Sequence, residues 1–312
     1  MKVNKFDAVG FGSATIDYIC LVNSIANYHQ SIFISDVKFF GGGCVPTALV
    51  SLQRLGGKSA FISLLGDDWI GKEIVKGLEK ENIYCGGIEL TECILSPFSF
   101  IQVNERFGKR AIAYYPGSSK LLKFNKTAGE LAKKGKILLI DGFIPQEDLK
   151  AAKYAHNNGV KVMLDANIIL DGTEGLLPYI DYLITSESFL FEYSGKKDID
   201  FSLKKIYRDI KPEILVTTLG KKGSVAVIDS EIVYVDSFDI NVVDTTGAGD
   251  VYHGAFLFGI IKDWGVKDIM IFSSAVSAIK CKSYGGRLGI PDYESTVNFL
   301  KERGIDIGKF RL

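Results

Sequence analysis

Asp244-Thr245-Thr246-Gly247-Ala248-Gly249-Asp250 lies between two apolar runs and decides how the rest of the sequence is interpreted. The preceding residues, Ile240-Asn241-Val242-Val243, predict the end of a strand. Residues 251–261 are apolar except for Tyr252 and His253, and they predict a buried helix. The glycines therefore belong to a turn at a helix N-terminus, where unpaired backbone N–H groups and the helix dipole favour an anion.

Asp250 closes this motif, at the mouth of the expected anion hole. A carboxylate would repel a resting phosphate, so we expect it to act chemically, as a base for a hydroxyl group that attacks a phosphoryl group. The amides of Gly247, Ala248 and Gly249 would bind the negative charge of the transferred group. The alternative is a glycine turn merely capped by an aspartate, which the second aspartate of the motif, Asp244, disfavours.

The composition restricts the possible partners. The 312 residues carry 37 Lys and Arg and 37 Asp and Glu, so the formal net charge is zero and offers no electrostatic case for nucleic-acid binding. The five cysteines form no Cys-x-x-Cys pair, which favours reduced thiols in a cytoplasm over a zinc site. The polar N-terminus does not resemble a secretory signal, and no apolar stretch is long enough to span a membrane. We expect a soluble cytoplasmic protein without nucleic-acid or membrane partners.

Short β-branched runs alternate with helical segments along most of the chain. Strands are expected at residues 8–11, 59–64, 137–140, 160–164, 182–184 and 214–217, and helices at residues 48–55, 71–81 and 147–157. This alternation predicts an α/β fold in which a parallel sheet carries helices on both faces.

Two regions interrupt the alternation. Residues 15–40 and 98–115 alternate like exposed antiparallel strands, with a hairpin tip at residues 105–109. They predict a small sheet that projects from the main domain. Because no linker or repeat is visible, we expect residues 1–312 to form a single domain with these segments inserted as a lid.

Two motifs carry a resemblance to a known family. The segment 244–250 resembles the second signature of the ribokinase-like carbohydrate kinases (the phosphofructokinase-B family), and Gly41-Gly42-Gly43, before a helix expected from about Thr47, resembles the first. The resemblance covers nearly the whole chain and implies a three-layer fold with a mostly parallel central sheet and a small β-sheet lid. It implies transfer of a phosphoryl group from ATP, with Mg²⁺, to a hydroxymethyl group, and a homodimer formed through the lid. Residues 243–291 are most similar to a subgroup that contains sulfofructose kinases and unassigned sugar kinases.

The resemblance also implies a sugar site. Asp17 would accept hydrogen bonds from two vicinal hydroxyls, and Gly42 and Gly43 would let the backbone approach the sugar. Pro46 stands where the family often has an asparagine, so Thr47 is the expected substitute. Asn167 follows a strand at the edge where open α/β sheets bind ligands, and we expect it to contact phosphate or substrate.

The nucleotide is expected along residues 217–223, which are also compatible with a simple hairpin turn. The residues expected at ATP are Thr218, Gly220, Gly223, Ser186 and Thr246. The family's Asn-x-x-Glu, which is linked to magnesium and phosphate, reads Ser186-Glu187-Ser188-Phe189 in this chain. Asp244, with carbonyls near Gly285 and Gly289, would hold a monovalent cation such as K⁺, as in some relatives.

The acceptor is expected to be neutral. The lid strand at residues 31–35 has no Lys or Arg, and Phe143 and Tyr114 stand where a cation would assist an anionic sugar. A buried anion without charged partners is strongly disfavoured, so we expect a ketose or pentose such as fructose or ribose. A nucleoside kinase of the same fold, with lid aromatics clamping the base, and a catalytically silent sugar-binding relative are the alternatives.

Overall fold

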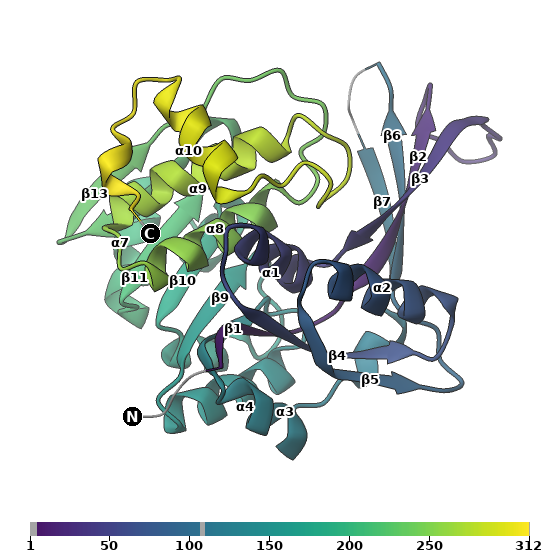
Figure 1. Cartoon of the computed structure of the whole chain (residues 1–312), viewed down its shortest axis with the longest axis horizontal. Coiled ribbons are helices and arrows are strands. Elements are labelled where there is room, and N and C mark those ends of the chain that lie inside the picture. The colour runs from purple at the N-terminus through teal and green to yellow at the C-terminus, as the bar shows by residue number, and fades with distance from the viewer. Residues whose placement is uncertain (1–4, 107–109, 312) are drawn as a thin grey trace.

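The computed structural model describes residues 5–106 and 110–311, which contain two separate sheets. Nine strands of these residues form the large sheet, in the order β13-β12-β11-β10-β9-β8-β1-β4-β5. Four others form the small sheet, in the order β3-β2-β6-β7, which projects to one side of the main body (Figure 1).

The large sheet is mostly parallel, as predicted. Its strands are β1 (Phe6–Phe11), β4 (Ser59–Gly66), β5 (Tyr84–Thr91), β8 (Gly135–Ile140), β9 (Lys161–Ala166), β10 (Tyr182–Ser186), β11 (Ile214–Thr218), β12 (Ser224–Ile228) and β13 (Glu231–Val235). The pairings from β5 to β11 are all parallel, and β12 and β13 add an antiparallel edge. Near-continuous apolar runs such as Ile137–Ile140 suit strands that are buried on both faces.

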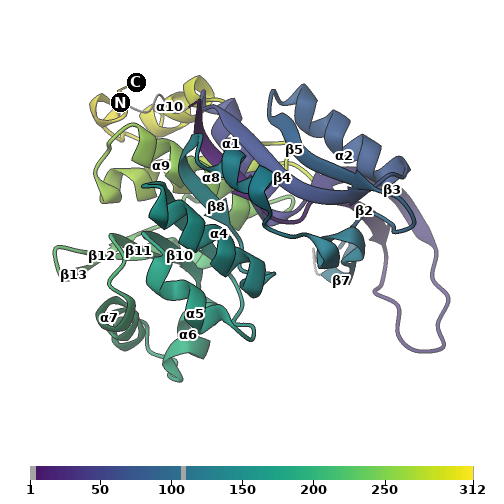
Figure 2. The same ribbon diagram turned by 90° about the horizontal axis from the view of Figure 1, so that it is seen from below.

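Helices cover both faces of this sheet, and the turned view in Figure 2 shows them on its two sides. The α-helices of the described residues are α1 (Cys44–Arg54), α2 (Trp69–Lys80), α3 (Lys126–Ala132), α4 (Pro145–Asn157), α5 (Thr173–Leu176), α6 (Glu187–Ser194), α7 (Ile199–Ile210), α8 (Ala248–Ile261), α9 (Val266–Lys280) and α10 (Tyr293–Lys301). Short 3₁₀ helices occupy Gly117–Leu121, Leu177–Tyr179, Gly220–Lys222 and Ile307–Lys309. One core cluster joins α1, α2, α8, α9 and α10 to the sheet, and a second joins α3 to α7 to the opposite face. The expected three-layer arrangement is therefore confirmed.

The segment before the glycine motif differs from the prediction. Residues 240–243 do not form a strand, because β13 ends at Val235 and the chain is irregular from there to the motif. The amides of Val243 and Asp244 instead donate to the carbonyl oxygen of Cys281, at 2.8 and 3.2 Å. Attachment to the end of α9 thus replaces strand pairing.

The small sheet consists of β2 (Thr15–Val22), β3 (Ile34–Gly42), β6 (Phe98–Asn104) and β7 (Arg110–Tyr115). β2–β3 and β6–β7 are antiparallel as expected, but β2 and β6 pair in parallel. Of the expected hairpin tip, residues 107–109 lie outside the described residues. In the register of this sheet Asp17 pairs with Ser99, and Ser99 pairs with Tyr114, so these three residues share one face.

No helix in residues 5–106 or 110–311 is both long and apolar enough to cross a membrane.

Candidate active site

The glycine motif forms an open helix N-terminus. Gly247 caps α8 in the left-handed region (φ 72°), and a Cβ there would lie 2.8 Å from the Cα of Gly286. The amide of Ala248 donates to the carbonyl of Thr245 at 3.2 Å, so it is not available to an anion as expected. Within the part of the chain that the structure describes, the amides of Gly247, Gly249 and Asp250 have no hydrogen-bond partner. Gly247, as expected, thus keeps a free amide at the cap, and the amides of Gly249 and Asp250, in the first turn of α8 at the positive end of the helix dipole, form the anion-binding feature.

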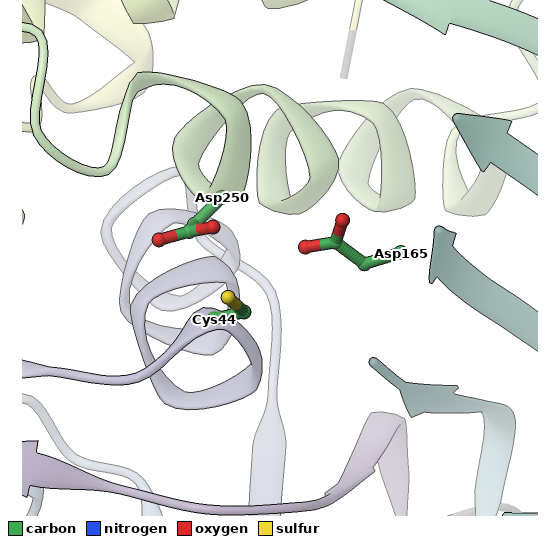
Figure 3. Close-up of side chains that lie close together, drawn as sticks. All are labelled: Cys44, Asp165 and Asp250. Carbon is green, nitrogen blue, oxygen red and sulfur yellow. The ribbon is translucent and has the colours of Figure 1, made fainter. Parts of the chain in front are cut away.

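Asp250 lies in the first turn of α8, half-buried, and faces two other polar side chains (Figure 3). One atom each of Asp250, Asp165 and Cys44 lies within 4.8 Å of the others. Asp165 comes from β9 and Cys44 from the start of α1, so three elements that are distant in sequence meet here. Cys44 was not predicted as a site residue, although its place directly after the Gly41–Gly43 run was a usable signal.

Burial raises the pKa values of the carboxyl groups in this cluster. Loss of solvent raises the pKa of Asp165 to about 6 and that of Asp141, which directly follows β8, to about 7, and the neighbouring carboxylates add to both shifts. The pKa of Asp250 is raised for the same first reason, while His253 acts to lower it. A carboxylate with a pKa raised toward neutrality is suited to general-base catalysis.

His253 ties the anion-binding turn to Asp165. Its Nδ1 lies 2.6 Å from the carbonyl oxygen of Gly249, and its Nε2 lies 3.2 Å from Oδ1 of Asp165. Because a carbonyl only accepts, Nδ1 donates to Gly249, and Nε2 faces the Asp165 carboxyl. These bonds give His253 a positioning role one helical turn from Asp250.

Asp17 and the glycines of the first motif form the expected sugar side. The buried Asp17 carboxylate accepts a hydrogen bond from the Thr15 hydroxyl at 2.9 Å. A Cβ on Gly42 would collide with this carboxylate. Gly43 caps α1 at φ 93°, where a Cβ would lie 2.5 Å from the carbonyl oxygen of Ser13. Both glycines therefore allow β3 to pass close to β2 and enter α1.

Arg287 is a buried cation on this side that the sequence did not predict. Its Nη2 donates to the carbonyl of Gly42 at 2.5 Å, and its Nε donates to the Thr47 hydroxyl at 3.2 Å. Burial lowers its pKa to about 10, against the opposing effect of Asp17. Thr47, expected at the sugar, is thus buried against Arg287 and holds that side chain. The glycine-rich segment 285–289 contained Arg287, but no local pattern marked it as buried.

The expected nucleotide residues line the carboxyl ends of adjacent parallel strands. The Ser186 hydroxyl, at the end of β10, donates to the carbonyl of Asn167 at 3.2 Å. Asn167 in turn donates to Oδ1 of Asp165 at 2.6 Å. Thr218 ends β11, and Gly220 and Gly223, at φ 58° and 92°, form the β11–β12 hairpin. Residues 217–223 therefore form a hairpin, at the sheet edge where α/β proteins bind ligands, and their contact with the nucleotide stays a prediction.

The Asp244 carboxylate accepts three hydrogen bonds from the protein itself. Its Oδ1 accepts from the amide and hydroxyl of Thr246, both at 2.8 Å, and its Oδ2 accepts from the amide of Gly285 at 2.8 Å. Burial acts to raise the pKa of Asp244, but these hydrogen bonds and the charge of Lys280 lower it. The Lys280 ammonium itself donates to the carbonyls of Asp244, at 3.1 Å, and Thr246. The structure thus places a lysine, not an open cation site, beside the turn.

The chain is similar to known proteins over most of its length. A sequence model of the pfkB family carbohydrate kinases matches residues 5–292. The chain is 26% identical over 298 residues to the ribokinase of Haemophilus influenzae, covering 93% of this chain and 97% of that protein. It is 26% identical over 323 residues to the probable fructokinase-5 of Arabidopsis thaliana, covering 95% and 97%. The solved structure of Arabidopsis thaliana ribokinase complexed with ribose and ATP superposes with a TM-score of 0.84 at 22% identity, covering 95% of this chain and 99% of that one.

Proposed function

Because the chain belongs to the pfkB family of carbohydrate kinases, which transfer a phosphoryl group to an alcohol, we propose that it transfers the γ-phosphoryl group of ATP to a hydroxymethyl group of a small neutral sugar. The acceptor is a ketose or pentose such as fructose or ribose. One observation carries the proposal: the half-buried Asp250 carboxylate lies in the first turn of α8, beside two unpaired amides.

In this reaction the sugar hydroxyl oxygen attacks the γ-phosphorus in line, the bond to ADP breaks, and Asp250 takes the hydroxyl proton. The amides of Gly249 and Asp250 stabilise the charge on the transferred group. ATP lies along Thr218, Gly220 and Gly223, at the ends of neighbouring strands.

Mg²⁺ would be bound mainly through the phosphate oxygens of ATP, whose charge it neutralises. The side chains available to it are Asn167, Ser186 and Asp165. Oδ2 of Asp165 is buried and has no hydrogen-bond partner among residues 5–106 and 110–311. An oxygen-rich edge of this kind fits a hard divalent cation. We leave a monovalent cation at Asp244 out of the proposal, because Lys280 takes the carbonyls beside it.

The charges on the sugar side support a neutral acceptor. Arg287 is buried, its Nη2 and Nε donate to Gly42 and Thr47, and the Asp17 carboxylate offsets its charge. Phe143 is apolar and partly exposed, after β8. A sulfonate or phosphate on the sugar would thus meet one buried cation, Arg287, whose charge the Asp17 carboxylate already offsets.

The lid does not favour a nucleoside acceptor. Phe98, Phe100 and Tyr115 pack together on one face of the small sheet, with ring centroids 5.1 to 5.6 Å apart along the chain of contacts. Tyr114 lies on the opposite face with Asp17, and its hydroxyl is 3.3 Å from that of Ser13. The four aromatics therefore do not form one clamp around a base.

The test compares kcat/KM for fructose, ribose, sulfofructose, fructose 6-phosphate and nucleosides in one assay with MgATP. We expect neutral sugars to be preferred. A preference of tenfold or more for either anion, about 1.4 kcal/mol, or for a nucleoside, contradicts the assigned acceptor. Binding of sugar and ATP without any phosphorylated product would instead identify a silent relative.

We further propose a single domain with lid segments at about 15–40 and 98–115, a cytoplasmic location, and a homodimer formed through the lid. The support for the dimer is an apolar outer face on which Phe39 and Phe100 are 55% and 48% exposed and Val37 and Tyr115 are also exposed. Burying this patch in a second copy would remove it from water. Light scattering that gives only a monomer at assay concentration rules out this assembly.

A further inference from the structure

Lys280 is a fully buried lysine whose charge is enclosed by the turn that precedes the anion-binding amides. It is the last residue of α9, and its ammonium donates to the carbonyl oxygens of Asp244 and Thr246. A buried charge is strongly disfavoured unless oxygen partners and an opposite charge compensate it. Here the two carbonyls and the Asp244 carboxylate provide both, since the charge of Lys280 also lowers the pKa of Asp244.

The turn is fixed to α9 on several sides. The Ser277 hydroxyl donates to the carbonyl of Ala248 at 2.8 Å, and the Cys281 carbonyl accepts from the amides of Val243 and Asp244. Lys280 lies between these two anchors in sequence. Its side chain therefore binds the two carbonyl oxygens and also fixes the backbone from which the Gly249 amide faces an anion.

We propose that the Lys280 ammonium takes the place of a dissociable monovalent cation at this turn, so that the enzyme needs neither K⁺ nor Na⁺. Backbone carbonyl oxygens such as those of Asp244 and Thr246 are the ligands that K⁺ uses in proteins. A second cation on the same oxygens would be repelled by the ammonium. The ammonium also acts on phosphoryl transfer. Its charge opposes the rise of the Asp250 pKa that burial causes, and it adds a positive potential near the anion-binding amides.

The decisive measurement uses the unaltered enzyme. It is transferred into tetramethylammonium salts, supplied with MgATP free of alkali ions, and assayed with and without KCl at constant ionic strength. We expect kcat/KM and the calorimetric affinity for ATP to agree within twofold in the two salts. An increase of tenfold or more in either quantity on addition of KCl overturns the proposal.

Substitution of Lys280 should make the enzyme dependent on a monovalent cation. Lys280→Ala leaves the carbonyls unpaired and opens space for an ion, so we expect low activity in tetramethylammonium and recovery of tenfold or more with KCl or NH₄Cl. KCl should also raise the melting temperature of this variant more than that of the parent. Equal responses in the two proteins would make Lys280 a merely structural residue.

Lys282→Ala is the matched control, since Lys282 is exposed two residues further on. It should keep the activity and the salt independence of the parent. The activity readouts depend on the proposed acceptor, whereas the ATP affinity depends only on nucleotide binding and the melting temperatures depend on neither. Absence of turnover with every sugar would therefore count against the assigned acceptor, while the two physical readouts still decide the role of Lys280.

Discussion

Asp250→Asn separates the chemical role of this side chain from its effect on folding. The amide keeps the shape of the carboxylate and its place beside Cys44, but it cannot act as a base for the hydroxyl proton. General-base assistance is worth about 10²- to 10⁴-fold, or about 3–5 kcal/mol of activation free energy. We expect kcat to fall by that factor while sugar and ATP still bind.

The same substitution should stabilise the apo protein at alkaline pH. Burial raises the folded-state pKa of Asp250 above 3.8, its ordinary value, so ionisation in the folded state is disfavoured. Well below pH 3.8 the group is protonated in both states and contributes no difference, whereas above its folded pKa the full penalty applies. The melting temperature of Asp250→Asn relative to the parent should therefore rise as the pH increases from below 3.8 to above the folded-state pKa.

Product formation by mass spectrometry, calorimetry with ATP and thermal unfolding across this pH range measure all three effects. Turnover within a few-fold of the parent would refute the assignment of Asp250 as the base. Lost activity with a lower melting temperature at alkaline pH would mean that the carboxylate has a structural role instead.

Three further substitutions test other parts of the site. Gly249→Ala should reduce kcat by about 10²-fold with folding retained, because the added Cβ meets nothing within 4 Å and would enter the space at the open amides. Gly77→Ala, equally unobstructed in α2, is the control and should stay active. Equal rates for the two variants would mean that the anion is not bound at Gly249. Asp141→Asn should flatten the pH dependence of stability, because a carboxyl group with a folded pKa of about 7 and an ordinary pKa of 3.8 destabilises the fold as the pH rises between these values. Relative to the parent, the free energy of unfolding of the variant should increase by on the order of a few kcal/mol at the alkaline end, which melting temperatures across this range would show. Asp17→Asn should raise KM for the sugar by about 10- to 100-fold, the equivalent of one lost charge-assisted hydrogen bond, with a smaller change in kcat; steady-state kinetics showing an unchanged KM would place the sugar elsewhere.

The parts of the fold and site that the sequence predicted are those with local signals. The glycine turn at 247–249 and the apolar run after it were sufficient to predict α8, and the strand–helix alternation was sufficient for the parallel sheet. The predicted strand at 240–243 was wrong because β-branched residues there favour extended backbone, while the partner that binds their amides, Cys281, is distant in sequence.

The cluster around the base could not be predicted as a cluster, because only Cys44, directly after Gly41–Gly43, stands beside a motif, and its members share no common local pattern. Cys44, Asp165 and His253 meet only when α1, β9 and α8 pack together. Arg287 and Lys280 posed a different difficulty. In a chain with equal numbers of basic and acidic residues, nothing marks which cations become buried, and the hydrogen bonds that compensate them come from remote backbone carbonyls.

The proposed sugar contacts and the proposed phosphoryl-transfer residues lie on two separate sheets. Asp17, Ser99 and Tyr114 lie on one face of the small sheet, whereas Asp250, Asp165 and Lys280 belong to the large body. Substitutions on that face of the small sheet change no side chain of the body that we assign to phosphoryl transfer. Evolution or protein engineering could therefore change the acceptor specificity through substitutions in the small sheet while the residues that transfer the phosphoryl group stay the same.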